Sequence, residues 1–139
     1  MKVMIDLNIL LDYFQKRLPF YHFSSIVISE VLKRNVYGVT ACHAITVIHY
    51  IISKYATKQI ANEKIDWLLE NMDIISGNKE LYKRARNLNM NDFEDAIVSA
   101  FAEEANCDYI ISRNVSDFCE SQIQAITPED FAIKYVNIK

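Results

Sequence analysis

Three groups of polar side chains in this sequence could carry out chemistry, and each contains at least one carboxylate. They are Asp6 with Asn8, Asp92 with Asp95, and Ser112, Arg113, Asn114 and Asp117. Carboxylates that converge without enough basic partners repel one another unless a cation neutralises them. Oxygen ligands alone suit a hard ion such as Mg²⁺ or Mn²⁺, which can activate water and stabilise charge on a phosphoryl oxygen.

Each carboxylate also has a purely structural explanation. Asp6 can cap the helix that follows it, and Asp92 can cap a later helix whose first turn favours acids through the helix dipole. Asp117 can be an ordinary loop residue. Asp95 is harder to explain in this way, since it shares a helix face with Asp92 and borders an apolar stripe. Glu94 is turned about 100° from Asp95 on an ideal helix, so we expect it to point elsewhere.

Short apolar runs alternate with helical patterns along the chain. The runs that we expect to be strands are Val3–Ile5, Val39–Ala41, Met72–Ser76, Tyr109–Ile111 and, at an edge, Ile123–Ile126. This alternation predicts an α/β fold whose parallel sheet has four or five strands and is covered by helices on both faces. If the first and fourth strands are neighbours, Asp6 and the loop beginning at Ser112 leave the same sheet edge, where open α/β sheets bind ligands.

Apolar residues at helical spacing, together with capping residues, predict the helices. Their expected starts lie near Asn8, Phe20, Ala44, Thr57, Asn78, Asp92 and Thr127. In the helix after Thr57, the expected buried face is Ala61, Ile65, Leu68, Leu69 and Met72. In the helix after Asp92, it is Phe93, Ile97, Ala100 and Phe101.

Composition excludes several classes of protein. Hydrophobic residues make up 51% of the 139 residues, which is enough for a core and too many for a disordered chain. The chain has Gly 2 and Pro 2, which argues against a turn-rich all-β fold and against linkers, so we expect one domain over residues 1–139. The net charge of −3 argues against tight nonspecific nucleic-acid binding but leaves room for a local basic groove.

Cysteine usage and hydropathy point to the cytoplasm. Cys42, Cys107 and Cys119 are widely spaced and form no CxxC pair, so neither a zinc site nor a disulfide framework is predicted. The apolar run before Asp6 is too short for a signal peptide, and the stretch 44–52 is too short to span a bilayer. We therefore expect a cytoplasmic protein without a membrane segment.

Four segments of the chain, in this order, resemble the PIN-domain family. They are Met4–Asp12, Asp92–Ala96, Ser112–Phe118 and Ile126–Phe131. The resemblance covers essentially the whole chain and implies a Rossmann-like α/β/α sandwich and a ribonuclease that uses Mg²⁺ or Mn²⁺ to hydrolyse RNA phosphodiester bonds. Many small members are the toxins of bacterial toxin–antitoxin pairs and commonly dimerise. The resemblance therefore also implies an RNA substrate, an antitoxin partner and a homodimer.

The same resemblance implies roles for individual residues. The catalytic and metal-ligating carboxylates would be Asp6, Asp95, Asp117 and, as an additional candidate ligand, Asp92. Asn8 would support the site by hydrogen bonding. Asn114 would act with Asp117 in the loop after strand four, where the commoner family pattern has Asp in place of Asn. Arg113 lies beside these acids in sequence, so we expect it to contact the RNA.

One position departs from the family pattern. The family usually has an acid on the helix after strand two, and this acid aligns with His49 or, in a second register, with Val47. A lone His on an apolar helix is more often a packed or hydrogen-bonded core residue than a metal ligand. Loss of a carboxylate weakens the hold on a cation, so the alternative function is a catalytically weakened PIN-fold module that binds RNA or a protein.

Other magnesium and nucleotide domains fit the sequence less well. A phosphoaspartyl phosphatase needs Asp-x-Asp after the first strand, and the second of these positions is Asn8. A receiver domain needs a Lys after a late strand, where this chain has Ser112 and Arg113. A nucleotide-binding Rossmann domain needs a glycine-rich first turn, and the chain's glycines are Gly38 and Gly77.

Overall fold

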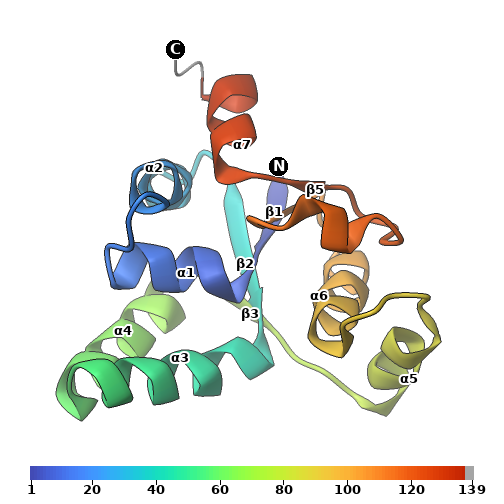
Figure 1. Ribbon diagram of the computed structural model, residues 1–139, viewed down its shortest axis with the longest axis horizontal. Coiled ribbons are helices and arrows are strands. Elements are labelled where there is room, and N and C mark those ends of the chain that lie inside the picture. The colour runs from blue at the N-terminus through green and yellow to red at the C-terminus, as the bar shows by residue number, and fades with distance from the viewer. Residues whose placement is uncertain (137–139) are drawn as a thin grey trace.

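The computed structural model describes residues 1–136, in which one sheet of five parallel strands forms the centre of the molecule (Figure 1). The strands are β1 (Lys2–Ile5), β2 (Tyr37–Ala41), β3 (Asp73–Ile75), β4 (Tyr109–Ile111) and β5 (Ala125–Ile126). Their order across the sheet is β3-β2-β1-β4-β5. The predicted α/β class with a parallel sheet is confirmed. The predicted domain runs to residue 139, and its last three residues lie outside the described part.

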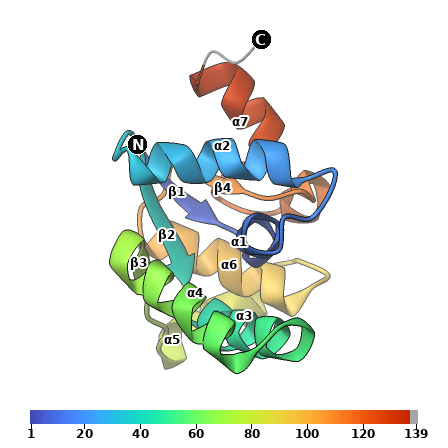
Figure 2. The same ribbon diagram turned by 90° about the vertical axis from the view of Figure 1, so that its left-hand side faces the viewer.

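Helices cover both faces of this sheet and give three layers (Figures 1 and 2). On one face lie α1 (Leu7–Phe14), α2 (Tyr21–Leu32), α3 (Cys42–Tyr55), α4 (Lys58–Asn71) and α7 (Pro128–Tyr135). On the other face lie α5 (Lys79–Asn87) and α6 (Phe93–Glu104). Among residues 1–136, no helix combines the length and the apolar character needed to cross a membrane.

Alternation along β1 explains why the molecule has two cores. Val3 and Ile5 point into the core beneath α1 to α4, whereas Met4 points into the core beneath α5 and α6. All three side chains are almost completely buried. Successive strand residues face opposite sides of a sheet, and here helices cover both sides. A strand in this position must therefore be apolar at every residue, as this segment of the sequence is.

The predicted helix starts at Thr57, Asn78 and Thr127 are confirmed, and each rests on a local capping bond. The side-chain oxygen of each residue accepts a hydrogen bond from the backbone N–H three residues later. Pro128 occupies the first position of α7, where a missing N–H costs nothing. These signals depend on neighbouring residues alone, which is why the sequence reveals them.

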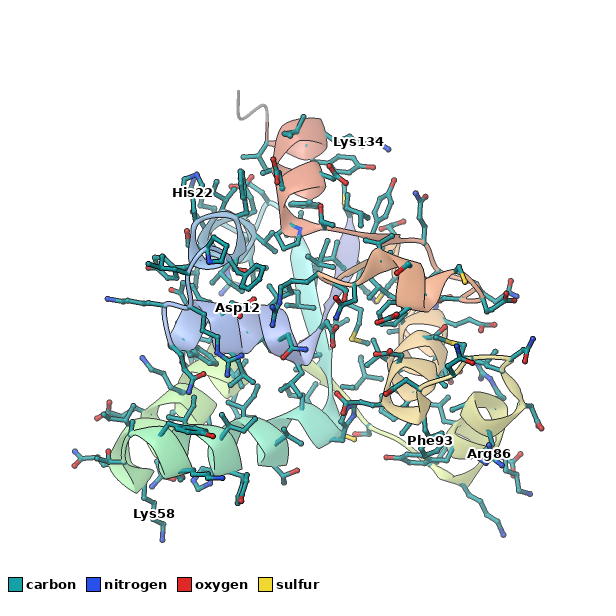
Figure 3. The ribbon with its side chains drawn as sticks, viewed as in Figure 1. Asp12, His22, Lys58, Arg86, Phe93 and Lys134 are labelled. Atoms are coloured by element: carbon teal, nitrogen blue, oxygen red, sulfur yellow. The ribbon has the colours of Figure 1, made fainter. Side chains whose placement is uncertain are left out.

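The prediction of a buried side chain is wrong for two residues. Leu69 is 58% exposed, because α4 packs through Ala61 and Leu68 and turns the next residue toward water. Phe93, labelled in Figure 3, is 46% exposed at the first position of α6. The periodicity of a helix fixes the direction of its buried face but not how far that face extends, because the extent depends on the neighbouring elements.

The sheet places the ends of β1 and β4 side by side. Ile5 pairs with Ile111 in register, and the backbone N–H of Asp6 donates to the carbonyl of Ile111 at 3.0 Å. Asp6 and Ser112 therefore follow adjacent strands at one edge. The condition that the first and fourth strands are neighbours is met, and the strand order reverses at this point, where α/β sheets bind ligands.

Candidate active site

Asp6 both caps α1 and presents a buried carboxylate at this edge. Its Oδ1 accepts a hydrogen bond from the N–H of Leu7 at 2.8 Å, and its Oδ2 accepts one from the hydroxyl of Ser112 at 2.9 Å. The residue is 6% exposed, and burial raises the pKa of its carboxyl against the lowering effect of these two hydrogen bonds. The capping and chemical explanations are thus compatible, because the bonds that cap the helix also fix the carboxylate.

Ser112 connects Asp6 to the loop that follows β4. Its hydroxyl is fully buried, donates to Asp6 and accepts a hydrogen bond from the backbone N–H of Asn114 at 3.2 Å. Asn114 precedes a short 3-10 helix, η1 (Val115–Phe118), and its carbonyl accepts from the N–H of Asp117 at 3.0 Å. A chain of hydrogen bonds therefore runs from the proposed catalytic carboxylate to the loop that carries Asp117.

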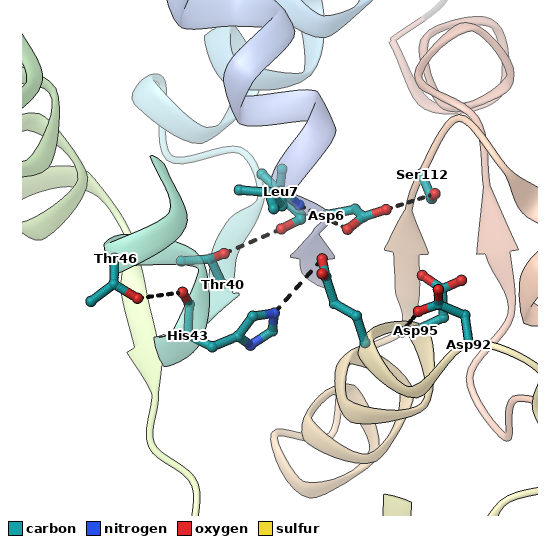
Figure 4. Close-up of polar contacts among 10 residues, drawn as sticks. Asp6, Leu7, Thr40, His43, Thr46, Asp92, Asp95 and Ser112 are labelled. Carbon is teal, nitrogen blue, oxygen red and sulfur yellow. Dashed lines mark hydrogen bonds and ion pairs between the residues drawn. The ribbon is translucent and has the colours of Figure 1, made fainter. Parts of the chain in front are cut away.

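The first turn of α6 brings further carboxylates to the same place. Asp92 caps this helix, since its side chain accepts the N–H of Asp95 at 3.0 Å (Figure 4). Burial raises the pKa of Asp95 to about 7, and the negative charges of nearby acids add to this effect. These acids, in order of effect, are Asp92, Asp6, Asp117 and Glu94. The acidic groups predicted from sequence therefore act on one another electrostatically.

Several of these acids face one open cleft of about 500 Å³. Its walls include Asp92 and Asp95 from the start of α6 and Asp117 from η1, with Glu120 beyond it. Asp6 does not line the cleft and lies buried at the neighbouring strand end. The cleft is therefore a strongly negative recess.

His43 and Glu94 belong to this site although the sequence analysis did not place them there. Glu94 Oε1 lies 3.9 Å from His43 Nε2, a contact drawn as the dashed line at the His43 ring in Figure 4. The negative charge of Glu94 also raises the pKa of Asp6. As expected, Glu94 does not line the cleft that Asp92 and Asp95 face. It faces the start of α3 instead. Within residues 1–136, neither ring nitrogen of His43 has a hydrogen-bond partner.

His49 lies away from the acids. Its Nε2 is 2.7 Å from Oδ1 of Asn62, which binds it to α4. Val47 packs, partly buried, against the core on the α1 to α4 face. The residue of α3 that approaches the carboxylates is therefore His43, in the first turn of that helix.

Arg113 does not line the acidic cleft. Its Nε lies 3.1 Å from Oδ2 of Asp12, and its guanidinium lies over the ring of Phe20, 4.1 Å from the centroid. Sequence reasoning missed Asp12, which looks like an ordinary polar position on α1. Asn8 is half-buried in the first turn of α1, two residues after Asp6.

The donor set fits a hydrated hard cation and does not form a closed cage. All the converging donors except His43 are carboxylate oxygens, which suit a hard cation. The negative charges of the neighbouring acids help to raise the pKa of Asp95, and a bound cation would offset their repulsion. In the part of the chain that the structure describes, no three His, Cys, Asp or Glu residues lie close enough together to hold a metal by themselves. Mg²⁺ usually binds through one or two carboxylates and keeps several waters.

Comparison with known proteins places this arrangement in a family. A family model for the PIN domain matches residues 2–116. Ribonuclease VapC1 of Aquifex aeolicus (strain VF5) is 27% identical over 139 residues, in an alignment that covers 96% of this chain and 95% of that protein.

Solved structures share the fold. VapBC2 from Rickettsia felis, bound to a promoter DNA fragment, matches with a TM-score of 0.70 at 16% identity, over 91% of this chain and 98% of that chain. A toxin–antitoxin complex from Klebsiella pneumoniae matches with a TM-score of 0.67 at 20% identity, over 91% and 97% of the two chains. The resemblance seen in the sequence is confirmed, and this chain belongs to the PIN domain family.

Proposed function

We propose that this protein is a divalent-metal-dependent endoribonuclease of the toxin type, which hydrolyses phosphodiester bonds in RNA. The observation that carries the proposal is the convergence of Asp92, Asp95 and Asp117 on one cleft beside the buried Asp6, at the switch point of the sheet. Burial and the surrounding acids also raise the pKa of Asp95 to about 7. Strongly perturbed acids that converge at such an edge are typical of catalytic sites. The similarity to ribonuclease VapC1 over nearly the whole chain supports this reaction.

Asp6 and Asp95 would hold Mg²⁺ or Mn²⁺, with Asp117 and Asp92 contributing directly or through water. When bound, such an ion activates water and stabilises negative charge on a phosphoryl oxygen. Ser112 keeps the Asp6 carboxylate in one orientation through the 2.9 Å hydrogen bond. Asn8 and Asn114 would hydrogen-bond to water or to the substrate beside these acids.

Glu94 would add a carboxylate beside His43 at the start of α3, although the family pattern aligns its α3 acid with His49 or Val47. The negative charge of Glu94 raises the pKa of both Asp6 and Asp95, so Glu94 lies close enough to them to add to the attraction of a cation. We expect Glu94→Gln to weaken metal-dependent cleavage. Glu103→Gln, an exposed change near the other end of α6, should leave cleavage unchanged.

The proposal has three further parts: the protein binds an antitoxin, it forms a homodimer, and it works in the cytoplasm. One of the structures with this fold is a toxin–antitoxin complex, which supports a protein partner for this chain. The cysteines Cys42, Cys107 and Cys119 are all free in the structure, which suits a reducing compartment. The homodimer rests on the family resemblance.

The test is cleavage of single-stranded RNA with Mg²⁺ or Mn²⁺. We expect the wild-type protein to cleave, and EDTA, Asp6→Asn and Asp95→Asn each to abolish cleavage. Asp73→Asn is the matched control, because Asp73 is exposed at the start of β3, at the opposite sheet edge. Cleavage that survives in Asp95→Asn contradicts the proposal. A wild-type protein that binds RNA but never cleaves it favours the alternative, a PIN-fold binding module.

A further inference from the structure

A second cleft, of about 360 Å³, lies on the other side of the loop after β4. We call it the Phe20 cleft. Its walls include Phe20, Phe23, Ser24, Arg113 and Glu129, which come from the start of α2, the loop after β4 and the start of α7. Arg113 directly follows Ser112, whose hydroxyl holds Asp6. The Phe20 cleft therefore adjoins the acidic site through one loop.

Two contacts fix the side chain of Arg113 in this cleft. Its Nε is 3.1 Å from Asp12, which is completely buried on α1, and its guanidinium stacks over Phe20. The Asp12 carboxylate accepts no hydrogen bond from residues 1–136, so its charge is balanced by the ion pair with Arg113 and by Arg17, 3.8 Å away. A buried carboxylate without hydrogen bonds is costly for stability alone, which suggests that it serves to position Arg113.

The charges of the Phe20 cleft do not suit a phosphate. Asp12 neutralises Arg113, and the carboxylate of Glu129 adds negative charge to the wall. The other walls include the rings of Phe20 and Phe23, Pro19, Thr127 and Pro128. They also include the fully buried hydroxyl of Ser24, which lacks a hydrogen-bond partner in the described chain. Flat aromatic walls with a few polar groups match an unpaired nucleobase, which has an apolar face and a polar edge.

We propose that the Phe20 cleft binds an unpaired base of the RNA substrate, next to the phosphate that the acidic site cleaves. Phe20 and Phe23 stack on the base, Arg113 contacts it through its planar guanidinium, and Asp12 is a positioning residue for Arg113. Glu129 accepts a hydrogen bond from an amino group on the edge of the base, which favours adenine, cytosine or guanine over uracil. This inference rests on the proposed function in one respect, namely that RNA is the ligand.

Binding is measured by fluorescence anisotropy in EDTA, where no metal-dependent cleavage occurs. The probes are single-stranded RNA decamers of A, C or U and a decamer of the same length whose sugars carry no bases. We expect the wild-type protein to prefer base-carrying strands, and to prefer A or C over U. Phe20→Leu should weaken binding of those strands about fivefold or more, with no effect on the strand without bases. Tyr37→Leu, an exposed aromatic at the start of β2, is the matched control.

Further variants separate positioning from folding. Arg113→Ala and Asp12→Asn should both reduce the preference for base-carrying strands. Arg113→Lys keeps the positive charge but should also reduce this preference, since Lys has no planar group. Glu129→Gln should reduce the preference for A and C over U. Thermal unfolding of each variant shows that it is folded, and Phe23→Leu provides a second stacking variant if Phe20→Leu is unstable.

The outcomes separate the two proposals. Equal binding of strands with and without bases by the wild-type protein, or an unchanged preference for base-carrying strands in Phe20→Leu, overturns the proposal that the Phe20 cleft binds a base. If the wild-type protein cleaves RNA with Mn²⁺ in that case, the ribonuclease proposal stands. If it shows the base preference and loses it in Phe20→Leu but never cleaves, the cleft stands and the ribonuclease proposal falls.

Discussion

At the scale of single residues, the site is a set of negative charges that the fold holds together at a cost. Asp95 shows this most clearly, because its carboxyl is partly buried and four other acids act on it. A pKa raised to about 7 means that the folded protein holds a proton there that the unfolded chain releases near pH 4. The stability contributed by this group is therefore present below about pH 4 and is lost as the pH rises toward 7.

We predict that Asp95→Asn stabilises the metal-free protein at pH 7.5. Asparagine keeps the shape of the side chain and removes the repelled charge. Water reaches part of this side chain, so we expect a gain of about 1 kcal/mol in the free energy of unfolding. Urea unfolding at pH 5 and pH 7.5 measures it, and the gain should shrink at the lower pH. A variant that is less stable than the wild type at pH 7.5 would contradict this, and Asp73→Asn should show no gain.

We predict that Ser112→Ala destabilises the protein by about 1–3 kcal/mol, because it leaves the buried Asp6 without one of its two hydrogen bonds. It should also slow RNA cleavage, since the carboxylate loses its fixed orientation. Thermal unfolding and a cleavage assay measure the two effects. Ser76→Ala, an exposed change just after β3 and outside the acidic cleft, is the control. Unchanged stability in Ser112→Ala would show that this hydrogen bond contributes nothing.

Some residues of this site can be predicted from the sequence, and the others cannot, for a physical reason. Asp6, Asp95 and Asp117 can be recognised because each stands just after a strand or near a helix start. Glu94 and His43 cannot, because their roles depend on how α6 faces α3 across the sheet. Nothing near Asp12 in sequence indicates that its partner is Arg113, near the other end of the chain.

At the scale of helices and strands, local signals decide where elements begin. α7 illustrates this, because Thr127 caps it, Pro128 starts it and acids occupy its first turn. Its buried residues Phe131 and Ala132 then attach it to the core. The extent of buried faces is less local, as the exposed Leu69 and Phe93 show. The fifth strand is two residues long and pairs with one neighbour, β4, at the sheet edge.

We predict that Thr127→Ala lowers the free energy of unfolding by about 1 kcal/mol, since it removes the hydrogen bond at the start of α7. Thr46→Ala is the control, because Thr46 is exposed within α3 and caps no helix. Urea unfolding of both variants measures the difference. Equal stability of the two variants would show that the cap does not matter for this helix.

At the scale of the whole molecule, the strand order makes the site. The order β3-β2-β1-β4-β5 puts β1 beside β4, so residues near the two ends of the chain share one edge. Alternating strands and helices predict a parallel sheet, but they do not state which strands are neighbours, because pairing depends on contacts between distant segments. From the sequence, the adjacency of the first and fourth strands is only a condition for a shared site, and the structure meets that condition.

The most direct test of the account is calorimetric titration of Mn²⁺ into the wild-type protein and Asp95→Asn at pH 7.5, with Asp73→Asn as the control. The account predicts saturable binding at millimolar Mn²⁺ or below for the wild type and Asp73→Asn, and loss of this binding in Asp95→Asn. Equal binding by all three proteins, or no binding by the wild type, would contradict the claim that the converging carboxylates form a cation site.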